Sequence, residues 1–377
     1  MAVYISSVGM TKFGIRDESL AELMREAALN AISDLHSDKK RFDCLIVGAM
    51  NPSEITEEDN LGAQIADELD LTPIPAFRIE NAPATGSTAL HQAFFFVSSG
   101  IYERVLVVTG EKMSEKSTKE LSALISKLMP EEERNLGITM PAMTAMMARC
   151  YMHKFGLNIE DLAHVAVKNH YNASLNPNAH FQKKITVEDV LSSSIISDPL
   201  RLYDCAPISD GAAALVVTLE KSEVEIAGLG HEADCLYYQH RDGFSSFLAS
   251  KKAAKKAYSM AKILPKNVDI VETHDAFTIL ELINTEDLCL FERGKSIEAL
   301  KAGVTSLNGD LPINPSGGLK AKGHPIGATG LAQICELFWQ LRGEAKKRQI
   351  EDANVGLAHN IGGFGDNAAV TILKRAD

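Results

Sequence analysis

Short runs of apolar, mostly β-branched residues recur along the chain and predict strands that are buried on both faces. They cover Leu45–Val47, Val105–Thr109, Ala213–Thr218, Val268–Glu272, Val355–Ala358 and Ala368–Leu373. Between them, apolar residues at spacings of three and four predict amphipathic helices over Ser19–Leu35 and Leu331–Leu341. Strands that alternate with helices need crossover connections, so the pattern predicts an α/β fold with a mainly parallel sheet.

The segment from Glu111 to about Pro199 has a different character. Methionines are frequent there, charges cluster, and the breakers Asn176-Pro177 and Asp198-Pro199 interrupt it. We interpret residues 111–199 as a mostly helical insertion that folds over the core. Methionine-rich stretches usually supply adaptable packing; the alternative is that this one covers an extended ligand.

A weak internal repeat suggests that the fold is duplicated. The segment Asn81–Gly86 (NAPATG) leads into an apolar helix and then a strand, and Gly323–Gly330 (GHPIGATG) does the same. We therefore expect an N-terminal half over residues 1–220, which contains the insertion, and a C-terminal half over residues 221–377. Backbone amides converge where a loop enters a helix, and such a junction suits a developing negative charge.

Composition narrows the possible functions. The chain has 377 residues, of which 45% are apolar and 23% charged, and its formal net charge is −12. These proportions are globular, and the negative charge argues against nucleic acid or an anionic membrane as a partner. We see no membrane-spanning run and no signal peptide, so we expect a cytoplasmic protein. Six scattered cysteines without metal-ligand spacing predict reduced, structural thiols and no metal site.

Three second-half segments combine polar residues with glycines or with a strand end. They are Glu272–Phe277, Asn314–Pro325 and His359–Gly365, and each contains a histidine. Ligands of parallel sheets bind beyond the carboxyl ends of the strands, and a histidine there can donate to a carbonyl or move a proton. A single histidine would most simply be structural, but three in such settings favour a site.

These segments carry a family resemblance that extends over essentially the whole chain. The sequences VVTGEKMS, LYDCAPISDGAAA, HDAF and NPSGGLKAKGHPIGATG, with Lys168–Asn172 and Asn360–Gly365, resemble the thiolase superfamily, in particular sterol-carrier-protein-type and archaeal acetoacetyl-CoA thiolases. The resemblance implies two similar α/β halves stacked as five αβαβα layers, with an inserted loop domain. It also implies a homodimer or tetramer that acts on acyl-CoA thioesters and needs no other cofactor.

The resemblance assigns roles to residues of this chain. His324 matches the Gly-His-Pro histidine that activates the nucleophile and holds a thioester oxygen, and His274 matches the residue that positions a water in the same oxyanion site. Asn360 stands where many thiolases have a basic cysteine, and Gly362 matches a backbone donor of a second oxyanion hole. In the glycine-bearing segment, Ser316, Lys320 and Lys322 are candidate substrate contacts, the lysines with CoA phosphates; solvated surface lysines are the alternative.

One residue departs from the family pattern. The nucleophile segment usually reads Asn-Ala-Cys-Ala-Ser-Gly, and here Pro83 stands where the cysteine belongs. Proline has no nucleophilic atom and no N–H, and one lost oxyanion donor typically costs about 3 kcal/mol of barrier. Because proline suits the first turn of a helix, the fold should tolerate it.

Possible substitutes for the missing groups are weak. His359 is adjacent to Asn360, but consecutive strand residues point to opposite faces. Thr85 is more simply a helix cap than a nucleophile, and Cys205 lies in a segment that looks like scaffold.

Three functions remain open, so we leave undecided whether the protein is an enzyme. The first is an acyl-CoA C-acyltransferase by descent that binds thioesters with impaired or absent turnover. The second is a cysteine-less lyase that performs retro-aldol chemistry through its histidines. The third is a non-catalytic acyl-CoA-binding subunit, associated with a hydroxymethylglutaryl-CoA synthase and a small OB-fold protein, as archaeal thiolases resembling this chain are.

Overall fold

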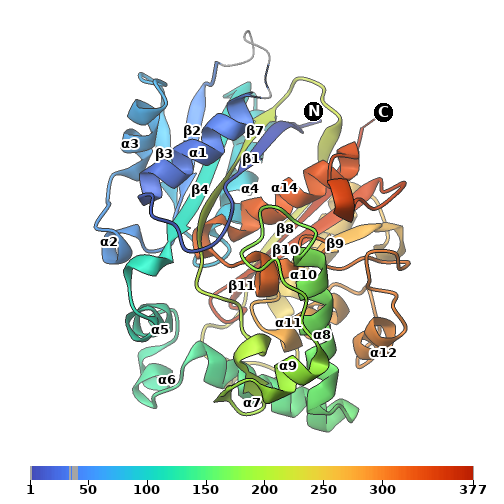
Figure 1. Ribbon diagram of the computed structural model, residues 1–377. Coiled ribbons are helices and arrows are strands. Elements are labelled where there is room, and N and C mark those ends of the chain that lie inside the picture. The colour runs from blue at the N-terminus through green and yellow to red at the C-terminus, as the bar shows by residue number, and fades with distance from the viewer. Residues whose placement is uncertain (1, 34, 36–40, 377) are drawn as a thin grey trace.

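The structure of the protein is a computed structural model that describes residues 2–33, 35 and 41–376 (Figure 1). The strands are β1 (Tyr4–Met10), β2 (Cys44–Gly48), β3 (Ala76–Ile79), β4 (Arg104–Lys112), β5 (Ile195–Ser197), β6 (Leu200–Arg201), β7 (Asp210–Thr218), β8 (Val224–Ala233), β9 (Ile270–Glu272), β10 (Val355–Gly362) and β11 (Asn367–Arg375). The helices are α1 (Leu20–Ser33), α2 (Pro52–Ile55), α3 (Leu61–Glu68), α4 (Thr85–Ser98), α5 (Thr118–Ser126), α6 (Glu131–Asn135), α7 (Met140–Phe155), α8 (Ile159–Ala173), α9 (Val187–Ser192), α10 (Leu248–Ala261), α11 (Thr278–Asp287), α12 (Ser296–Lys301), α13 (Gly318–Lys322) and α14 (Thr329–Arg342).

The helices and strands form the stacked layers that the resemblance predicts. Helix α1 packs on β1, β4 and β7, while α4 and α14 pack against each other and against strands of both halves. Helix α10 covers β8 and β11 on the far side. One apolar cluster joins side chains of the two central helices, among them Leu90 and Phe338, to strands of both halves. The fold prediction is therefore confirmed.

The predicted strands and helices exist, but the sheet is not mainly parallel. Nine strands run in the order β3-β2-β4-β7-β1-β8-β11-β10-β9. Among the described residues of this sheet, β2/β3, β2/β4 and β9/β10 are the parallel pairs, whereas β1/β7, β4/β7, β1/β8, β8/β11 and β10/β11 are antiparallel. The prediction was wrong because it assumed helical crossovers throughout; β10 and β11 are joined by a tight turn, and β4 and β7 by the insertion. The predicted first helix ends at Ser33, and Asp34 lies outside the described residues.

Two of the unpredicted strands, β1 and β8, lack a simple apolar pattern. In β8 the reason is close packing against a helix. A Cβ on Gly228 would lie 2.4 Å from the carbonyl oxygen of Ala257, and one on Gly230 would lie 1.9 Å from that of Ala253. Both alanines belong to α10, so the strand needs glycine where the helix backbone touches it.

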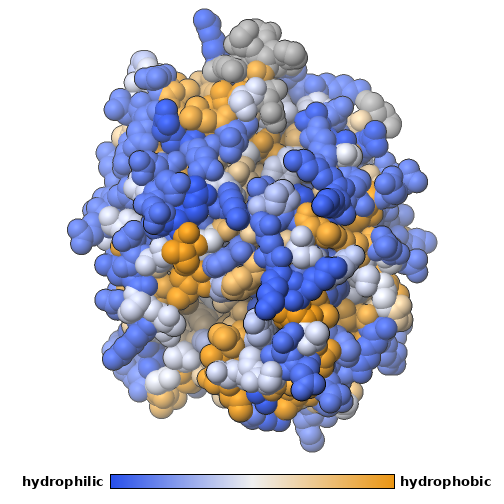
Figure 2. Space-filling model, in the orientation of Figure 1, coloured by the Kyte–Doolittle hydropathy of each residue, from blue (hydrophilic) through white to orange (hydrophobic). Residues whose placement is uncertain are grey.

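The insertion is mostly helical, as predicted. It contains α5 to α9 and adds the short antiparallel pair β5/β6, which the sequence did not suggest. In Figure 1 these helices form the lower part of the molecule, beneath the N-terminal strands. Figure 2 shows apolar side chains interrupting the hydrophilic surface over this half. Among the described residues, no helix is long and apolar enough to cross a membrane.

The starts of α4 and α14 meet backbone to backbone. A Cβ on Gly86 would lie 2.7 Å from the amide nitrogen of Leu331, and one on Gly330 would lie 2.4 Å from that of Ser87. The two loop-to-helix junctions of the internal repeat therefore lie against each other at the centre of the molecule, next to the cavity described below.

Candidate active site

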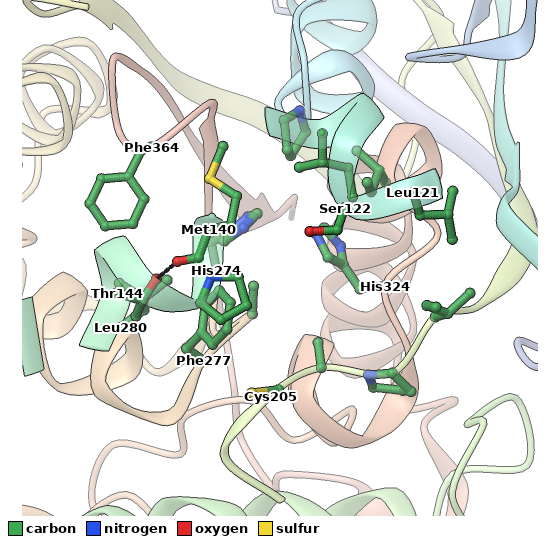
Figure 3. Close-up of a pocket in the computed structure, with 18 of the residues that line it drawn as sticks. Leu121, Ser122, Met140, Thr144, Cys205, His274, Phe277, Leu280, His324 and Phe364 are labelled. Atoms are coloured by element: carbon green, nitrogen blue, oxygen red, sulfur yellow. Dashed lines mark hydrogen bonds between the residues drawn. The ribbon is translucent and has the colours of Figure 1, made fainter. Parts of the chain in front are cut away.

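A cavity of about 400 Å³ lies where the insertion meets the core (Figure 3). Its wall combines both halves with α5 and α7, which supply Leu121, Ser122, Met140 and Thr144. His274 and His324 also line it. None of the lining residues, all within the described part of the chain, is charged; the full set is Pro83, Met113, Thr118, Leu121, Ser122, Ile125, Leu128, Met140, Pro141, Thr144, Ile196, Leu202, Cys205, Ala206, Pro207, Ile208, His274, Ala276, Phe277, Leu280, His324, Ile326, Ile361, Gly363 and Phe364.

Hydrogen bonds define the tautomer of His324. Its Nδ1 lies 2.7 Å from Thr329 Oγ1, and that hydroxyl donates to the carbonyl oxygen of Pro325 at 2.9 Å. Because the hydroxyl proton is used there, Nδ1–H is the donor to Oγ1, and Nε2 carries a free lone pair. Burial, with a smaller effect of Lys322, lowers the pKa of His324 to about 3. The ring is neutral, and its Nε2 is a hydrogen-bond acceptor or base.

His274 has the opposite arrangement. The Asn360 amide donates from Nδ2 to His274 Nδ1 at 3.0 Å, so Nδ1 is the acceptor and the ring proton is on Nε2. Burial, followed by His324 and His359, lowers the pKa of His274 well below its usual value. The His274 and His324 rings lie edge to face with centroids 5.2 Å apart. The cavity therefore has one neutral imidazole that donates next to one that accepts.

A buried network holds the two histidine segments together. Asp275 accepts hydrogen bonds from the Leu319 amide at 2.6 Å and from Asn169 Nδ2 at 2.7 Å. Gly318, with φ of 61°, lies so close that a Cβ there would be 2.2 Å from Asp275 Oδ2. Glycine is thus required at this point of the NPSGG segment, because it lets the loop pack onto the carboxylate beside His274.

Pro83 lines the cavity, two residues before α4 and therefore outside its first turn. Thr85 is the first residue of α4 and not its cap, which corrects that interpretation. Its hydroxyl accepts from the Asn81 backbone N–H and donates to the Ala82 carbonyl, so it is already used in the preceding loop. His359 contacts Ser250 Oγ at 2.9 Å and Thr273 Oγ1 at 3.1 Å and is not among the lining residues. Neither Thr85 nor His359 is placed to replace a missing nucleophile or base.

The position of Cys205 differs from the sequence-based prediction. It lines the cavity, although its segment was interpreted as scaffold. Its thiol donates to the Arg201 carbonyl at 3.4 Å and, among the described residues, makes no hydrogen bond with either cavity histidine. Burial raises its pKa to about 12. The thiol is therefore unreactive. The sequence feature that could have placed Cys205 at the cavity is its position in the family segment LYDCAPISDGAAA.

The remaining candidates lie outside this cavity. Ser316 donates from its amide and hydroxyl to Glu272, at 2.9 and 2.7 Å, and Lys322 Nζ lies 3.6 Å from Glu272 Oε2. Lys320 and Lys322 are each only 1% exposed. This burial corrects the alternative of solvated surface lysines, whereas contact of these lysines with CoA phosphates stays a prediction. Gly362 pairs with Asn367 between the lining residues Ile361 and Gly363.

Comparisons with known proteins place this geometry in a family. Residues 3–221 match the protein family "Thiolase, N-terminal domain", and residues 230–375 match the family "Thiolase C-terminal domain-like". The chain belongs to the thiolase superfamily. An acetyl-CoA acetyltransferase of Methanothermobacter thermautotrophicus is 42% identical over 381 residues, which cover 99% of both chains. Human sterol carrier protein 2 is 35% identical over 398 residues, which cover 99% of this chain and 72% of the relative.

Solved thiolase-fold structures agree with these sequence relatives. An "Ltp2-ChsH2(DUF35) aldolase" superposes with a TM-score of 0.85 at 26% identity and covers 99% of this chain and 98% of that one. Human mitochondrial 3-ketoacyl-CoA thiolase in complex with CoA superposes with a TM-score of 0.76 at 17% identity, covering 100% and 98%. The second likeness shows the fold alone.

Proposed function

We propose that this thiolase-superfamily protein binds an acyl-CoA thioester in the cavity, with the thioester carbonyl at the histidine pair and no cofactor beyond CoA itself. The observation that carries the proposal is the pairing of a donating His274 with an accepting His324 in a wall without charged side chains. A thioester oxygen needs a donor, and an uncharged wall suits a neutral acyl group better than one with a free carboxylate. The named acetyl-CoA acetyltransferase relatives support this substrate class.

We further propose that Pro83 occupies the position of the family's nucleophilic cysteine, and that Gly362 supplies an oxyanion amide. Pro83 is the cavity residue nearest to α4 in sequence, which fits the family pattern of a nucleophile at a helix start. Proline cannot accept an acyl group, and Cys205 is held as a neutral thiol. We infer that by descent the protein is an acyl-CoA acyltransferase whose cysteine-dependent turnover is impaired or absent.

Two measurements on the purified protein test this function. Calorimetric titration with acetyl-CoA and hexanoyl-CoA should give saturable binding, weakened about tenfold by His274→Ala through loss of a donor. His164→Ala, on the exposed face of α8, is the matched control and should bind normally. Thiolytic cleavage of acetoacetyl-CoA should remain at background. Absence of binding by any acyl-CoA would refute the site, and ordinary thiolase turnover would refute the role of Pro83.

A second function is favoured by the tautomers and by the likeness to an aldolase structure. In a retro-aldol cleavage of a β-hydroxyacyl-CoA, His324 Nε2 would take the β-hydroxyl proton as the Cα–Cβ bond breaks. The electron pair would go to the thioester oxygen as an enolate held by His274 Nε2–H, and reprotonation at Cα would release acyl-CoA and a carbonyl compound. Asn360 orients His274 here and moves no proton. Release of an aldehyde or ketone from a β-hydroxyacyl-CoA panel tests it, and failure with every member counts against it.

A third function, a non-catalytic subunit, concerns partners. The similar aldolase structure is named for two components, Ltp2 and ChsH2(DUF35). In this chain Ile196 and Leu202 line the cavity and are exposed. We propose a cytoplasmic homodimer or tetramer, for which the sheet edge β3 with exposed Phe77 offers a surface. An OB-fold acyl-CoA-binding protein and a hydroxymethylglutaryl-CoA synthase are the proposed partners. Light scattering and affinity purification from native cells test these associations; a monomer that captures neither partner would exclude them.

A further inference from the structure

A second cavity of about 320 Å³ lies behind the wall of the first. The two share Leu202, Cys205, Ala206 and Pro207, so a single stretch of chain separates them. The second cavity is lined further by His170, Phe181, Lys183, Ile185, Tyr203 and Lys320. Its size is in the range of small-molecule sites, and neither cavity histidine of the thioester site belongs to it.

Lys320 brings an ammonium group without hydrogen bonds into this cavity. The residue is 1% exposed, and within the described chain no acceptor for its Nζ is found. Cys205, whose thiol is neutral, Asp204 and Asp275 are its acidic neighbours. Asp204 already accepts from the Arg201 amide and Thr278 Oγ1, and Asp275 from the Leu319 amide and Asn169.

The charge of Lys320 is therefore poorly compensated. Burial raises the pKa of Asp204, and it raises that of Asp275 to about 7, so both carboxyl groups resist ionisation. Burial lowers the pKa of Lys320 to about 8. A buried ammonium costs free energy unless acceptors surround it, and the space in front of this one can hold such an acceptor.

His170 adds a second polar group of defined character. Its Nδ1 lies 3.1 Å from the Lys183 carbonyl, so Nδ1 carries the proton and Nε2 a lone pair. Nε2 is buried and has no partner, while the ring stacks on Phe181 with centroids 5.6 Å apart. The site therefore needs an acceptor for Lys320 and a donor for His170, beside an apolar wall of Phe181, Ile185 and Leu202.

We propose that this second cavity binds a small hydroxycarboxylic acid with an apolar body, whose carboxylate meets Lys320 and whose hydroxyl donates to His170. Phe181 and Ile185 pack against the apolar part. The exposed Lys183 at the lining adds positive charge that favours entry of an anion. Because the two cavities share lining residues between Leu202 and Pro207, a ligand in one contacts the same stretch of chain as a ligand in the other.

Calorimetric titration of the full chain with 2-hydroxyhexanoate, hexanoate and hexanamide tests the site. We expect affinity to fall about tenfold at each step, as first the hydroxyl and then the carboxylate is removed. Lys320→Met should abolish the preference for hexanoate over hexanamide, and His170→Phe the preference for the hydroxy acid. Lys266→Met, at an exposed lysine, is the control for a lost charge and should change nothing.

Location is tested by repeating the titration with the thioester cavity filled by hexanoyl-CoA. Continued binding of 2-hydroxyhexanoate places it in the second cavity, whereas stoichiometric displacement overturns the proposal. Equal affinity for hexanoate and hexanamide in the unaltered protein also overturns it, and this comparison needs no variant to fold. Absence of saturable binding by 2-hydroxyhexanoate has the same consequence.

Discussion

Replacing Pro83 by cysteine should restore an acyl acceptor to the cavity. The residue lines the cavity with His274 and His324 and precedes α4. A helix start and a nearby histidine favour a thiolate, whereas burial opposes it, as it does for Cys205. We therefore expect the Pro83→Cys variant to become acetylated by acetyl-CoA at its new thiol.

The size of the effect follows from the ionisation of the two thiols that would share the cavity. With a pKa of about 12, Cys205 has roughly one thiolate in ten thousand at about pH 8. An unperturbed thiol, with a pKa of about 8.5, is about one quarter ionised at the same pH. The thiol of Pro83→Cys should thus react about two thousand times faster than Cys205, and faster still if the helix start lowers its pKa. The cost in stability should be no more than about 1 kcal/mol, from the greater freedom of the unfolded chain.

The assay is peptide mass spectrometry after incubation with acetyl-CoA, which resolves each cysteine separately. Pro52→Cys is the matched control, because Pro52 is also buried at the start of a helix but does not line the cavity. Adding His324→Ala to Pro83→Cys should slow acetylation about a hundredfold by removing the base. The reasoning is refuted if the folded variant alkylates with a small thiol reagent but never acetylates, or if acetylation is independent of His324.

Three further predictions address the tautomer of His324, the buried neutral ring of His359 and the contact between helices α4 and α14. Thr329→Val removes the hydroxyl that accepts from His324 Nδ1–H and should lower acyl-CoA affinity about tenfold by calorimetry, whereas Thr329→Ser should retain the affinity. An equal loss of affinity in both variants would contradict the tautomer assigned to His324. Burial lowers the pKa of His359 to about 3, so the folded protein loses stability as pH falls below about 6.5. The destabilisation measured for His359→Gln by urea unfolding should therefore be about 1.3 kcal/mol smaller at about pH 5.5 than at about pH 7, and a destabilisation that is equal at the two pH values would contradict it. Gly86→Ala should cost at least about 2 kcal/mol by the same measurement, because its Cβ would meet backbone atoms, whereas Gly62→Ala, with its nearest contact at 3.6 Å, should be neutral or stabilising.

The sequence was sufficient for the fold and for the two histidines because both depend on local patterns. Apolar runs marked β2, β4, β7, β9, β10 and β11, and the family motifs brought His274 and His324 to one cavity. Strand direction was not predictable in this way. It depends on whether a connection is a crossover, a turn or an insertion, and local apolar pattern does not encode that choice. Strand β8 was not predicted because its glycines are required by close contact with the backbone of α10, and local sequence does not show that contact.

The side chains of the glycine-bearing segment show a second limit. Lys320 and Lys322 stand beside glycines in the sequence, which left contact with CoA phosphates and solvated surface lysines as the alternatives. In the structure both are buried beneath other segments. Glu272 lies 3.6 Å from Lys322 Nζ, whereas Asp204 and Asp275 lie near Lys320 and accept no hydrogen bond from its amine among the described residues. Charge pairing between distant segments has no periodic signature, and only the fold reveals it. The two amines differ in their surroundings, although neither makes a hydrogen bond within the described chain: Lys322 Nζ is paired with a carboxylate oxygen 3.6 Å away, while Lys320 lines a cavity. This difference is the physical basis for assigning a ligand to Lys320 and an ion pair to Lys322.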